Sequence, residues 1–414
     1  MSFSRIGMIG LGYIGLPTAA LLASRGLEVV GVDVDERAVE TINAGRVHIV
    51  EPDLDIVVRS VVTTGNLRAT LVPEPADAFL VAVPTPFTGG HRPDLSYIET
   101  AARAIAPVLE RGNLVVLEST SPVGTTEKLS AWLAGARPDL SFPHVAGEAS
   151  DVRIAHCPER VLPGHVLQEL VNNDRVIGGV TRACATRAEA LYRTFVKGEC
   201  LLTGARTAEL CKLTENAYRD VNIAFANEMS LVCETLDVNV WELIELANRH
   251  PRVDILKPGP GVGGHCIAVD PWFIVDSAPD AARLIRAARE VNDGKPGHVV
   301  ARVIERAERF KSPCIACFGL AFKADIDDLR ESPALGIVEA LADSGAGRLV
   351  VVEPNVGALP RTLAGRDGIR LADTREALAV ADIVVGLVDH REFRELSPES
   401  LSEKIVIDTR GMWR

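Results

Sequence analysis

Hydrophobic residues in the first 200 positions fall into short runs that alternate with helical stretches. Residues 5–33 contain an apolar run, a glycine-rich turn, a helical stretch and a second apolar run. Further apolar runs begin near residues 78, 113, 151 and 174, and residues 97–109 show helical spacing. Short apolar strands that alternate with helices predict a parallel sheet with helices on both faces.

The pattern changes between Thr207 and Leu236, where the sequence has neither glycine nor proline. Its helical periodicity extends over about eight turns. More helix is expected over 240–250 and 281–293, with a glycine-rich loop at 259–264 between them. After Pro313 the alternation of strands and helices returns. We therefore predict an α/β protein with two Rossmann-like doubly wound domains, joined by a long central helix and a helical connector.

Composition narrows the class of protein. A chain of 414 residues is too long for one core, so we divide it into segments 1–200, 201–296 and 297–414. A net charge of −12 and 5% aromatic residues argue against nucleic-acid binding. No apolar run approaches the ~18 residues that a membrane span needs. Eight cysteines without a paired framework suit a reducing compartment, so we expect a cytoplasmic protein.

Cys314 and Cys317 form the only closely spaced cysteine pair that resembles a metal motif. They lie in "PCIACFGLAF", which predicts a buried strand. Residues three apart on a strand point to opposite faces, so they cannot share a metal ion. We therefore interpret both as core residues and predict no metal site.

A glycine fingerprint, Gly10, Gly12 and Gly15, follows the first predicted strand and opens a helix. The three glycines allow a tight turn, close approach of a pyrophosphate, and close helix–strand packing. Asp33 ends the next strand, where a carboxylate can bind both ribose hydroxyls and repel a 2′-phosphate. These features predict NAD rather than NADP. Thr85, at the end of a later strand, is a further candidate contact.

Cys266 follows four glycines in "GPGVGGHCIAVDPW" and precedes Asp270 by four positions. One interpretation is a small buried residue, the commoner role of a lone cysteine. The other is a nucleophile exposed by a loop that lets substrate approach. A thiol beside an NAD site suggests aldehyde oxidation through a hemithioacetal and a thioester. A general base must then help water cleave the thioester, and Glu159 in "CPERVLPG" is a candidate.

Two further groups of polar residues have both a functional and a neutral interpretation. Lys212, Asn216, Arg219 and Asn227 recur at helical spacing, which suits oxyanion binding or merely a solvated face. Lys323 follows a predicted strand and Arg330 precedes a helix, so they could bind a phosphate or decorate the surface. Around them, the order strand, turn, helix, strand and acid (Glu353) echoes residues 5–33 without the glycine fingerprint.

Taken together, these stretches resemble the UDP-glucose/GDP-mannose dehydrogenase family over essentially the whole chain. The resemblance is carried by "GLGYIGLPTA", "VPTP", "ESTSPVG", "CPER", "ELCKLTENA", "GPGVGGHCIAVDPW" and "FGLAFKADIDDLRESPA". It implies an NAD-binding domain (1–200), a central helical dimerisation domain (201–296) and a UDP-sugar-binding domain (297–414). It also implies oxidation of a sugar C6 alcohol to a carboxylate with two NAD and one water, in a homodimer or higher oligomer.

The resemblance also implies roles for individual residues. Catalytic roles are implied for the nucleophile Cys266, the acid/base Lys212, the oxyanion contact Asn216, the base Glu159, the carboxylate Asp270 and the water-binding Thr120. Besides the glycines, NAD contacts are implied for Tyr13, Ile14, Asp33, Thr85, Thr126 and Arg330. Nucleotide-sugar contacts are implied for Arg160, Val161, Lys212, Asn216, Arg219, His250, Arg252, Gly263, Phe322, Lys323 and Arg410. His250 and Arg252 are expected to reach the neighbouring subunit's site.

The sequence around Cys266 gives information about which sugar the enzyme oxidises. Members acting on UDP-glucose typically have "GGSCFPKD"-like text, whereas this chain has "GGHCIAVD", with His265 before the cysteine and Val269 in place of the lysine. This text and "LANRHPRV" look most like members that oxidise UDP-N-acetyl-D-mannosamine to its uronic acid for surface polysaccharides. UDP-N-acetylglucosamine and UDP-glucose remain alternative substrates. A non-catalytic nucleotide-sugar sensor is the alternative from another class.

Overall fold

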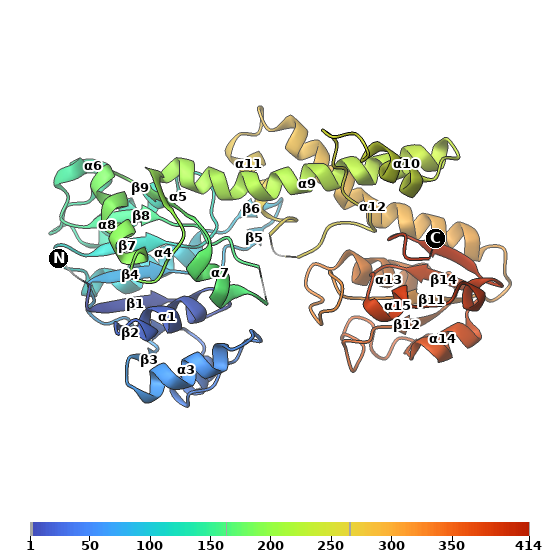
Figure 1. Ribbon diagram of the computed structural model, residues 1–414, viewed down its shortest axis with the longest axis horizontal. Coiled ribbons are helices and arrows are strands. Elements are labelled where there is room, and N and C mark those ends of the chain that lie inside the picture. The colour runs from blue at the N-terminus through green and yellow to red at the C-terminus, as the bar shows by residue number, and fades with distance from the viewer. Residues whose placement is uncertain (1–2, 163, 265, 414) are drawn as a thin grey trace. The chain divides into compact units, whose positions relative to one another are not determined.

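The computed structural model describes residues 3–162, 164–264 and 266–413, so His265 lies outside the described residues. The chain divides into two compact units, unit 1 ending at Glu215 and unit 2 beginning at Asn216 (Figure 1). Each unit contains its own sheet of mainly parallel strands. The predicted α/β class is confirmed. The predicted division into three segments stays a prediction.

The sheet of unit 1 has the strand order β10-β9-β8-β7-β4-β1-β2-β3. Its strands are β1 (Arg5–Ile9), β2 (Glu28–Val32), β3 (Leu67–Thr70), β4 (Ala78–Val81), β7 (Leu114–Leu117), β8 (Arg153–His156), β9 (Arg175–Gly179) and β10 (Cys200–Gly204). A separate two-stranded sheet pairs β5 (Phe87–Thr88) with β6 (Arg92–Pro93). All neighbours in the large sheet are parallel except β8 and β9.

Helices cover both faces of this sheet because successive strand residues point in opposite directions. In β7, Leu114 and Val116 pack in one apolar cluster, whereas Val115 and Leu117 pack in the other. The helices of unit 1 are α1 (Gly15–Ser24), α2 (Glu36–Asn43), α3 (Leu54–Thr63), α4 (Ser96–Ile105), α5 (Thr125–Ala136), α6 (Pro143–Ala146), α7 (Val166–Asn172) and α8 (Arg182–Tyr192), with short 3₁₀ turns η1 (Ala106–Val108) and η2 (Gly147–Ala149). The predicted two-sided cover is confirmed.

The antiparallel pairing of β8 and β9 corrects the expectation of an all-parallel sheet. Ala155 lies opposite Gly179 and His156 opposite Gly178. An antiparallel neighbour needs no crossover back to the other end of the sheet, so the short helix α7 is enough to connect the strands. The apolar pattern of a strand is the same in either direction, which is why the sequence did not reveal this reversal.

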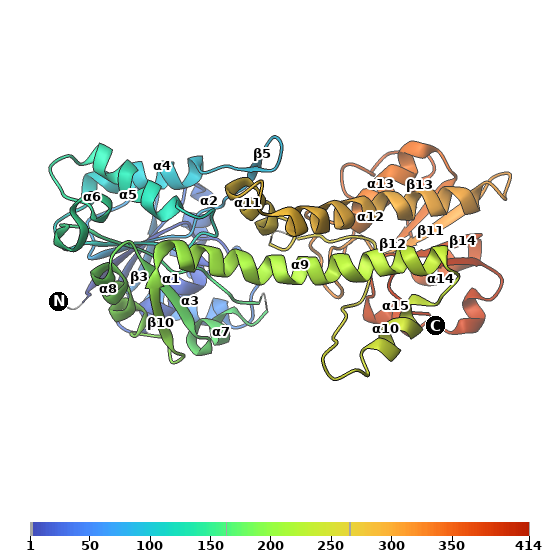
Figure 2. The same cartoon turned by 90° about the horizontal axis from the view of Figure 1, so that it is seen from above.

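The predicted long helix is α9 (Ala205–Thr235), and the boundary between the units falls within it. The other helices of this region are α10 (Val240–Ala247), α11 (Asp270–Ser277) and α12 (Arg283–Ala307). Figure 2 shows α12 beside α9, and buried hydrogen bonds join the two helices. Helix α12 continues past Pro296 and through the predicted segment boundary, because Val299 and Val303 pack in the core of unit 2.

Unit 2 contains a parallel sheet with the order β13-β12-β11-β14-β15. Its strands are β11 (Cys314–Phe318), β12 (Arg348–Val352), β13 (Ile369–Leu371), β14 (Ile383–Gly386) and β15 (Ile405–Asp408). Its further helices are α13 (Pro333–Ser344), α14 (Thr374–Val380), α15 (Arg391–Arg394) and the 3₁₀ turn η3 (Pro398–Leu401). Cys314 and Cys317 pack in clusters on opposite faces of this sheet, as predicted for core residues.

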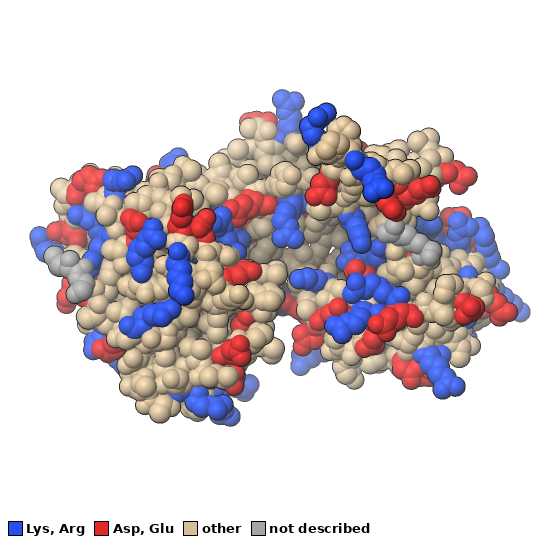
Figure 3. All heavy atoms as spheres, in the orientation of Figure 1, with Lys and Arg blue, Asp and Glu red and all other residues tan. Residues whose placement is uncertain are grey.

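Side chains of both signs are interspersed over the face drawn in Figure 3, so the net charge of −12 does not gather into one acidic patch there. Among the described residues, no cluster of His, Cys, Asp and Glu could hold a metal ion. None of the helices in the described ranges combines the length and the apolar character that crossing a membrane requires.

Candidate active site

The glycine fingerprint lies between β1 and α1, and each glycine has a separate geometric reason. Gly10 has φ +91°, a left-handed conformation that suits glycine. A Cβ atom on Gly15 would lie 1.8 Å from the Gly10 carbonyl oxygen, so only glycine lets the helix start this close to the strand. A Cβ on Gly12 would meet nothing within 4 Å, and this open side leaves room for a pyrophosphate.

Asp33 follows β2, and its carboxylate holds the glycine turn through a hydrogen bond. Its Oδ2 accepts the Leu11 N–H at 2.8 Å, and its Oδ1 accepts the Asp35 N–H at 3.0 Å. The carboxylate stays half-buried, and each oxygen has a second lone pair for a ribose hydroxyl. Tyr13 is exposed and Ile14 half-buried in the same turn. The Asp33 carboxylate therefore suits a ribose of NAD, and the NAD contacts implied for Tyr13 and Ile14 stay predictions.

Thr85 and Thr120 follow the neighbouring strands β4 and β7, and the structure brings them together. The Thr85 hydroxyl donates to the Thr120 carbonyl oxygen at 2.5 Å. Thr126 lies differently, because it is fully buried in the first turn of α5. Its N–H and hydroxyl donate to Glu209 of α9 at 2.7 and 2.6 Å. Glu209, which the sequence analysis missed, therefore caps α5, where the helix dipole favours an acid.

Glu159 lies beyond the end of β8 and is only 8% exposed. Its Oε1 accepts the Arg160 N–H at 2.6 Å, and its Oε2 pairs with the buried guanidinium of Arg175. The guanidinium of Arg160 pairs with Glu215 at 2.6 Å, while half-buried Val161 packs against the core of unit 1. Glu159 is thus held in place through both of its carboxylate oxygens.

Cys266 is exposed, which contradicts the interpretation of a packing residue. The segment after it turns at once into α11, because the Cys266 carbonyl oxygen accepts the N–H groups of Val269 and Asp270 at 3.1 and 2.8 Å. Asp270, the first residue of α11, is only 3% exposed. An accessible thiol therefore lies one turn ahead of a buried carboxylate.

Two asparagines of α9 hold the segment that carries Cys266. At its end, the Asn216 side-chain amide donates to Asp270 Oδ2 at 2.5 Å. At its start, the Asn227 side-chain oxygen accepts the Gly259 N–H at 2.8 Å. The two asparagines lie eleven residues apart, which is about three turns, so they share one face of the helix. Both are buried, at 7% and 0% exposure.

The predicted polar stripe on α9 is therefore partly wrong as a single surface. Asn216 and Asn227 are buried, Lys212 is half-buried, and Arg219 is exposed. Arg219 comes directly before buried Asp220, and one residue is a rotation of about 100° on a helix, so Arg219 lies on the solvent side. Neither the solvated-face interpretation nor the oxyanion interpretation anticipated that the amides would hold the cysteine segment.

A buried ion pair between α9 and α12 extends this arrangement. Arg289, 1% exposed, donates to Asp220 at 2.6 Å, and its guanidinium reaches the Ile267 carbonyl oxygen at 3.5 Å. Asn292 donates to the same Asp220 oxygen at 2.8 Å and accepts from the Asn227 amide at 2.8 Å. Sequence reasoning missed these residues, although Asp220 follows Asn216 by one helical turn, which is a signal that could have been used.

The glycines before Cys266 are explained by packing within unit 2. A Cβ on Gly263 would lie 2.4 Å from the Glu331 carbonyl oxygen, and one on Gly264 would lie 3.0 Å from the Phe322 ring. A Cβ on Gly259 would lie 2.7 Å from the guanidinium of Arg410. The structure thus gathers Gly263, Phe322 and Arg410, three predicted sugar-binding residues, around one glycine loop.

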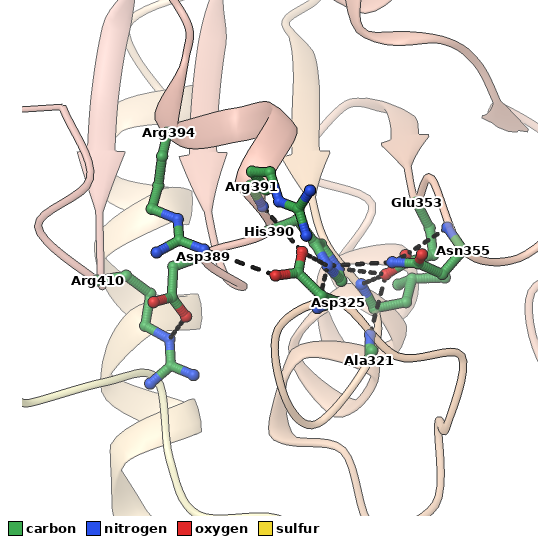
Figure 4. A network of polar contacts seen from close by, with 10 residues as sticks. Ala321, Asp325, Glu353, Asn355, Asp389, His390, Arg391, Arg394 and Arg410 are labelled. Carbon is green, nitrogen blue, oxygen red and sulfur yellow. Dashed lines mark hydrogen bonds and ion pairs between the residues drawn. The ribbon is translucent and has the colours of Figure 1, made fainter. Parts of the chain in front are cut away.

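Lys323 and Arg330 lie on the loop between β11 and α13, as predicted, and both are exposed. Arg330 makes an ion pair with Asp328 at 2.7 Å. Figure 4 shows how the loop is fastened: the Asp325 N–H donates to His390 Nδ1 at 2.9 Å, and the Asp325 carboxylate accepts the Arg391 N–H at 2.9 Å. Lys323 therefore lies on a loop that these hydrogen bonds hold in place.

Glu353 confirms the predicted echo of the first unit but is sealed from solvent. It follows β12 as Asp33 follows β2, and its Oε2 accepts the Leu320 N–H at 2.7 Å. However, His390 Nε2 lies 3.1 Å from that oxygen, and Asn355 lies on the other oxygen (Figure 4). With Glu353 only 5% exposed, its carboxylate is closed to a ribose, whereas that of Asp33 is half-buried.

Of the remaining predicted residues, His250 and Arg252 are exposed and Arg410 is half-buried. His250 and Arg252 follow α10 and are joined locally, because the Arg252 N–H donates to His250 Nδ1 at 3.3 Å. Arg410 pairs with Asp389 at 3.4 Å (Figure 4). The exposed guanidinium of Arg252 is thus placed where a phosphate could reach it.

We predict that Asp33→Lys weakens NAD binding at least tenfold, because the lysine cannot accept ribose hydrogen bonds and no longer supports Leu11. Isothermal titration calorimetry with NAD measures the loss. Exposed Glu36→Lys in α2 adds the same charge change nearby and serves as the control. Equal affinity in Asp33→Lys and the control would contradict the assignment of the ribose site.

Comparison with known proteins adds independent information. Three sequence profiles of the UDP-glucose/GDP-mannose dehydrogenase family match the chain: the NAD binding domain at residues 4–196, the central domain at 206–294 and the UDP binding domain at 316–414. The chain is 66% identical over 413 residues to an NDP-N-acetyl-D-galactosaminuronic acid dehydrogenase of Ralstonia nicotianae, covering 100% of this chain and 97% of that protein.

Two other relatives are called UDP-N-acetyl-D-mannosamine dehydrogenases. The protein of Yersinia pestis is 61% identical over 425 residues, which cover 100% of both chains. The solved structure from Pyrococcus horikoshii is 41% identical, with a TM-score of 0.87 over 99% of this chain and 96% of that one. NAD is therefore the cofactor, and its profile covers the glycine fingerprint. The chain belongs to the UDP-glucose/GDP-mannose dehydrogenase family of NAD-dependent oxidoreductases.

Proposed function

We propose that this enzyme oxidises UDP-N-acetyl-D-mannosamine at C6 to UDP-N-acetyl-D-mannosaminuronate, a precursor of surface polysaccharide. The observation that carries the reaction type is the exposed Cys266 thiol on a segment that Asn216 and Asn227 anchor to α9. The names of relatives that are 59–61% identical over the whole chain support the choice of sugar. A reducing compartment, the cytoplasm, keeps such a thiol active.

The proposed chemistry has two oxidations and one hydrolysis. Lys212 takes the proton of the C6 hydroxyl while the carbon loses a hydride, which NAD accepts when bound. The Cys266 thiolate then adds to the aldehyde carbon, and the resulting hemithioacetal loses a second hydride and becomes a thioester. Asn216 and Lys212, one turn apart on α9, donate to the oxyanion at the adduct stages.

Hydrolysis restores the thiol. Water, held by Thr120, attacks the thioester carbon while the Glu159 carboxylate accepts its proton. The carbon–sulfur bond breaks, the sulfur leaves as a thiolate, and the sugar leaves as a carboxylate. The half-buried Asp33 and the open side of Gly12 suit the NAD ribose and pyrophosphate. For the UDP moiety we propose Lys323, Arg410 and the other cations assigned by resemblance.

A second substrate is favoured by one specific observation. The Ralstonia relative, at 66% identity, is named for an N-acetyl-D-galactosaminuronic acid. Both candidates carry a C2 acetamido group, so we propose a UDP-N-acetylhexosamine as the class and the manno sugar as the preferred member. The loss of the lysine at Val269, just before Asp270, argues against UDP-glucose.

We predict the highest initial rate with UDP-N-acetyl-D-mannosamine and two NADH per sugar consumed. Rates with UDP-N-acetyl-D-galactosamine, UDP-N-acetyl-D-glucosamine and UDP-glucose are measured in parallel by NADH absorbance. The products are identified by mass spectrometry. Preference for UDP-glucose would overturn the choice of sugar class. Formation of one NADH per sugar would show that the reaction is not a four-electron oxidation. An absence of turnover with every sugar would favour a non-catalytic nucleotide-sugar sensor.

We predict that Cys266→Ser lowers steady-state turnover by at least 1000-fold and leaves UDP-sugar affinity within about twofold, because a serine hydroxyl is a far weaker nucleophile at neutral pH. Stopped-flow NADH formation and calorimetry measure the two quantities. Cys211→Ser, on half-buried Cys211 of α9, is the matched control. Near-normal turnover of Cys266→Ser would show that the covalent mechanism is wrong.

We also propose a homodimer formed along α9. Tyr218, Phe225 and Val232 recur every seven residues and are 69%, 52% and 39% exposed. Met229 lies between the last two, and Leu236, which follows the helix, is 66% exposed. Apolar residues at alternating spacings of three and four form the seam of paired helices. A second copy of the chain, with the same seam, is the partner this pattern suits.

We predict that Phe225→Asp converts the dimer into monomers at micromolar concentration, because it places a charge at the centre of the apolar seam. Light scattering coupled to size exclusion measures the mass. Glu228→Gln changes an exposed residue of the same helix off the seam and should leave the dimer intact. A dimeric Phe225→Asp variant would show that α9 does not form the interface.

A further inference from the structure

Unit 1 contains a buried cluster with two carboxylates and one guanidinium. Glu118 follows β7 directly, Glu159 lies beyond β8, Arg175 begins β9 and Tyr192 ends α8. Their exposures are 3%, 8%, 3% and 0%. The proposed mechanism uses Glu159 but gives no role to Glu118, although Glu118 precedes the proposed water ligand Thr120 by two residues.

Hydrogen bonds connect the cluster in two halves. The Tyr192 hydroxyl donates to Glu118 Oε1 at 2.6 Å, while Arg175 pairs with Glu159 and donates to the Leu170 carbonyl oxygen at 3.1 Å. The guanidinium carbon of Arg175 lies 5.8 Å from the centroid of the Tyr192 ring. The second oxygen of Glu118 is buried with no hydrogen-bond partner among the described residues.

This arrangement holds one positive charge for two carboxylates. Arg175 can neutralise only one, and it is in direct contact with Glu159. A second, uncompensated carboxylate at this depth is costly, so Glu118 retains its proton more strongly. Burial is the main cause that raises the pKa of Glu118 to about 7, and the Glu159 charge adds to it. The Tyr192 hydrogen bond and the Arg175 charge oppose the rise.

The groups facing Glu118 come from three other elements. They are Tyr192 of α8, Cys157 and Glu159 beyond β8, and Arg175 of β9. Burial raises the pKa of the Cys157 thiol to about 12, and the pKa of Tyr192 also lies well above its usual value because of burial. Both therefore stay neutral around pH 7. Of Glu118, Cys157 and Tyr192, only Glu118 changes its charge in that range.

We propose that Glu118 is a positioning residue that tunes Glu159: by losing its proton it places a second negative charge in the buried cluster and raises the proton affinity of Glu159. The inference rests on the proposed role of Glu159 in thioester hydrolysis. Because coupling between two titrating groups is reciprocal, the same repulsion that makes Glu118 hold its proton makes ionised Glu118 strengthen Glu159 as a base.

The sign of the pH dependence follows. Below pH 7 Glu118 is neutral, and Glu159 is balanced by Arg175 alone. Above pH 7 Glu118 is ionised, Glu159 binds protons more strongly, and water attack on the thioester is faster. The Glu118→Gln variant keeps the shape of the side chain and imitates the neutral form at every pH.

The experiment measures thioester hydrolysis directly. Full-length enzyme is mixed with NAD and limiting UDP-N-acetyl-D-mannosamine, quenched at intervals, and the adduct on Cys266 is followed by intact mass between pH 6 and 9. Wild-type hydrolysis should show an inflection near pH 7. Glu118→Gln should match wild type within about twofold at pH 6 and hydrolyse about three- to tenfold more slowly at pH 8.5, because it cannot supply the second negative charge.

Two further variants separate tuning from a merely structural effect. Tyr192→Phe removes the hydrogen bond that favours ionised Glu118, so the inflection should move to higher pH and not disappear. Exposed Glu199→Gln, the control, should leave the profile unchanged. If Glu118→Gln fails to fold, the shift in Tyr192→Phe still decides. An unshifted inflection in Tyr192→Phe, or a rate loss in Glu118→Gln that is equal at all pH values, overturns the proposal.

Glu159→Gln, run in parallel, distinguishes failure of the inference from failure of the proposed function. If Glu159→Gln accumulates thioester while Glu118→Gln keeps the wild-type pH profile, the base role stands and the tuning role is wrong. If Glu159→Gln accumulates no thioester although sugar is consumed, the base role is wrong and the tuning role falls with it.

Discussion

The proposed chemistry depends on the attachment of the cysteine segment to the buried face of α9. A loop rich in glycine cannot hold a thiol in place by itself, because its backbone has the greatest conformational freedom. Asn227 holds the start of this segment through Gly259, and Asn216 holds its end through Asp270. Loss of either buried hydrogen bond would leave unpaired polar groups, at about 1–3 kcal/mol each. These two hydrogen bonds therefore restrict the loop and fix the position of the segment that carries Cys266.

The two units reuse one backbone design for different purposes. In both, a glycine in a left-handed conformation follows the first strand, and an acid after the second strand accepts a backbone N–H from that turn. Asp33 keeps solvent access, as a ribose ligand must. Glu353 is covered by His390 and Asn355, so in unit 2 the acid supports the loop that presents Lys323. The same local geometry therefore leaves the acid accessible in one unit and covers it in the other.

Much of the fold and of the candidate site could be predicted, because the relevant signals are short. The glycine fingerprint, the central helix and the alternating strands were placed by spacing alone, and the structure confirms them. The roles assigned by resemblance stay predictions, although Cys266 is exposed as a nucleophile must be. The direction of β9 and the length of α12 were not recovered, since an apolar run carries no direction and tertiary packing extends α12 past Pro296.

The sequence by itself determined the class of fold and the cofactor and pointed to Cys266 as a candidate nucleophile, because periodicity, glycine spacing and residue chemistry are local properties. Only the tertiary structure decided which polar groups become buried together. Asp220 with Arg289, and Glu118 with Tyr192, are far apart in the chain, and each pair is joined only once helices and strands pack. Burial gives these contacts their strength, since desolvation magnifies both charge and hydrogen bonding, and no linear pattern records it.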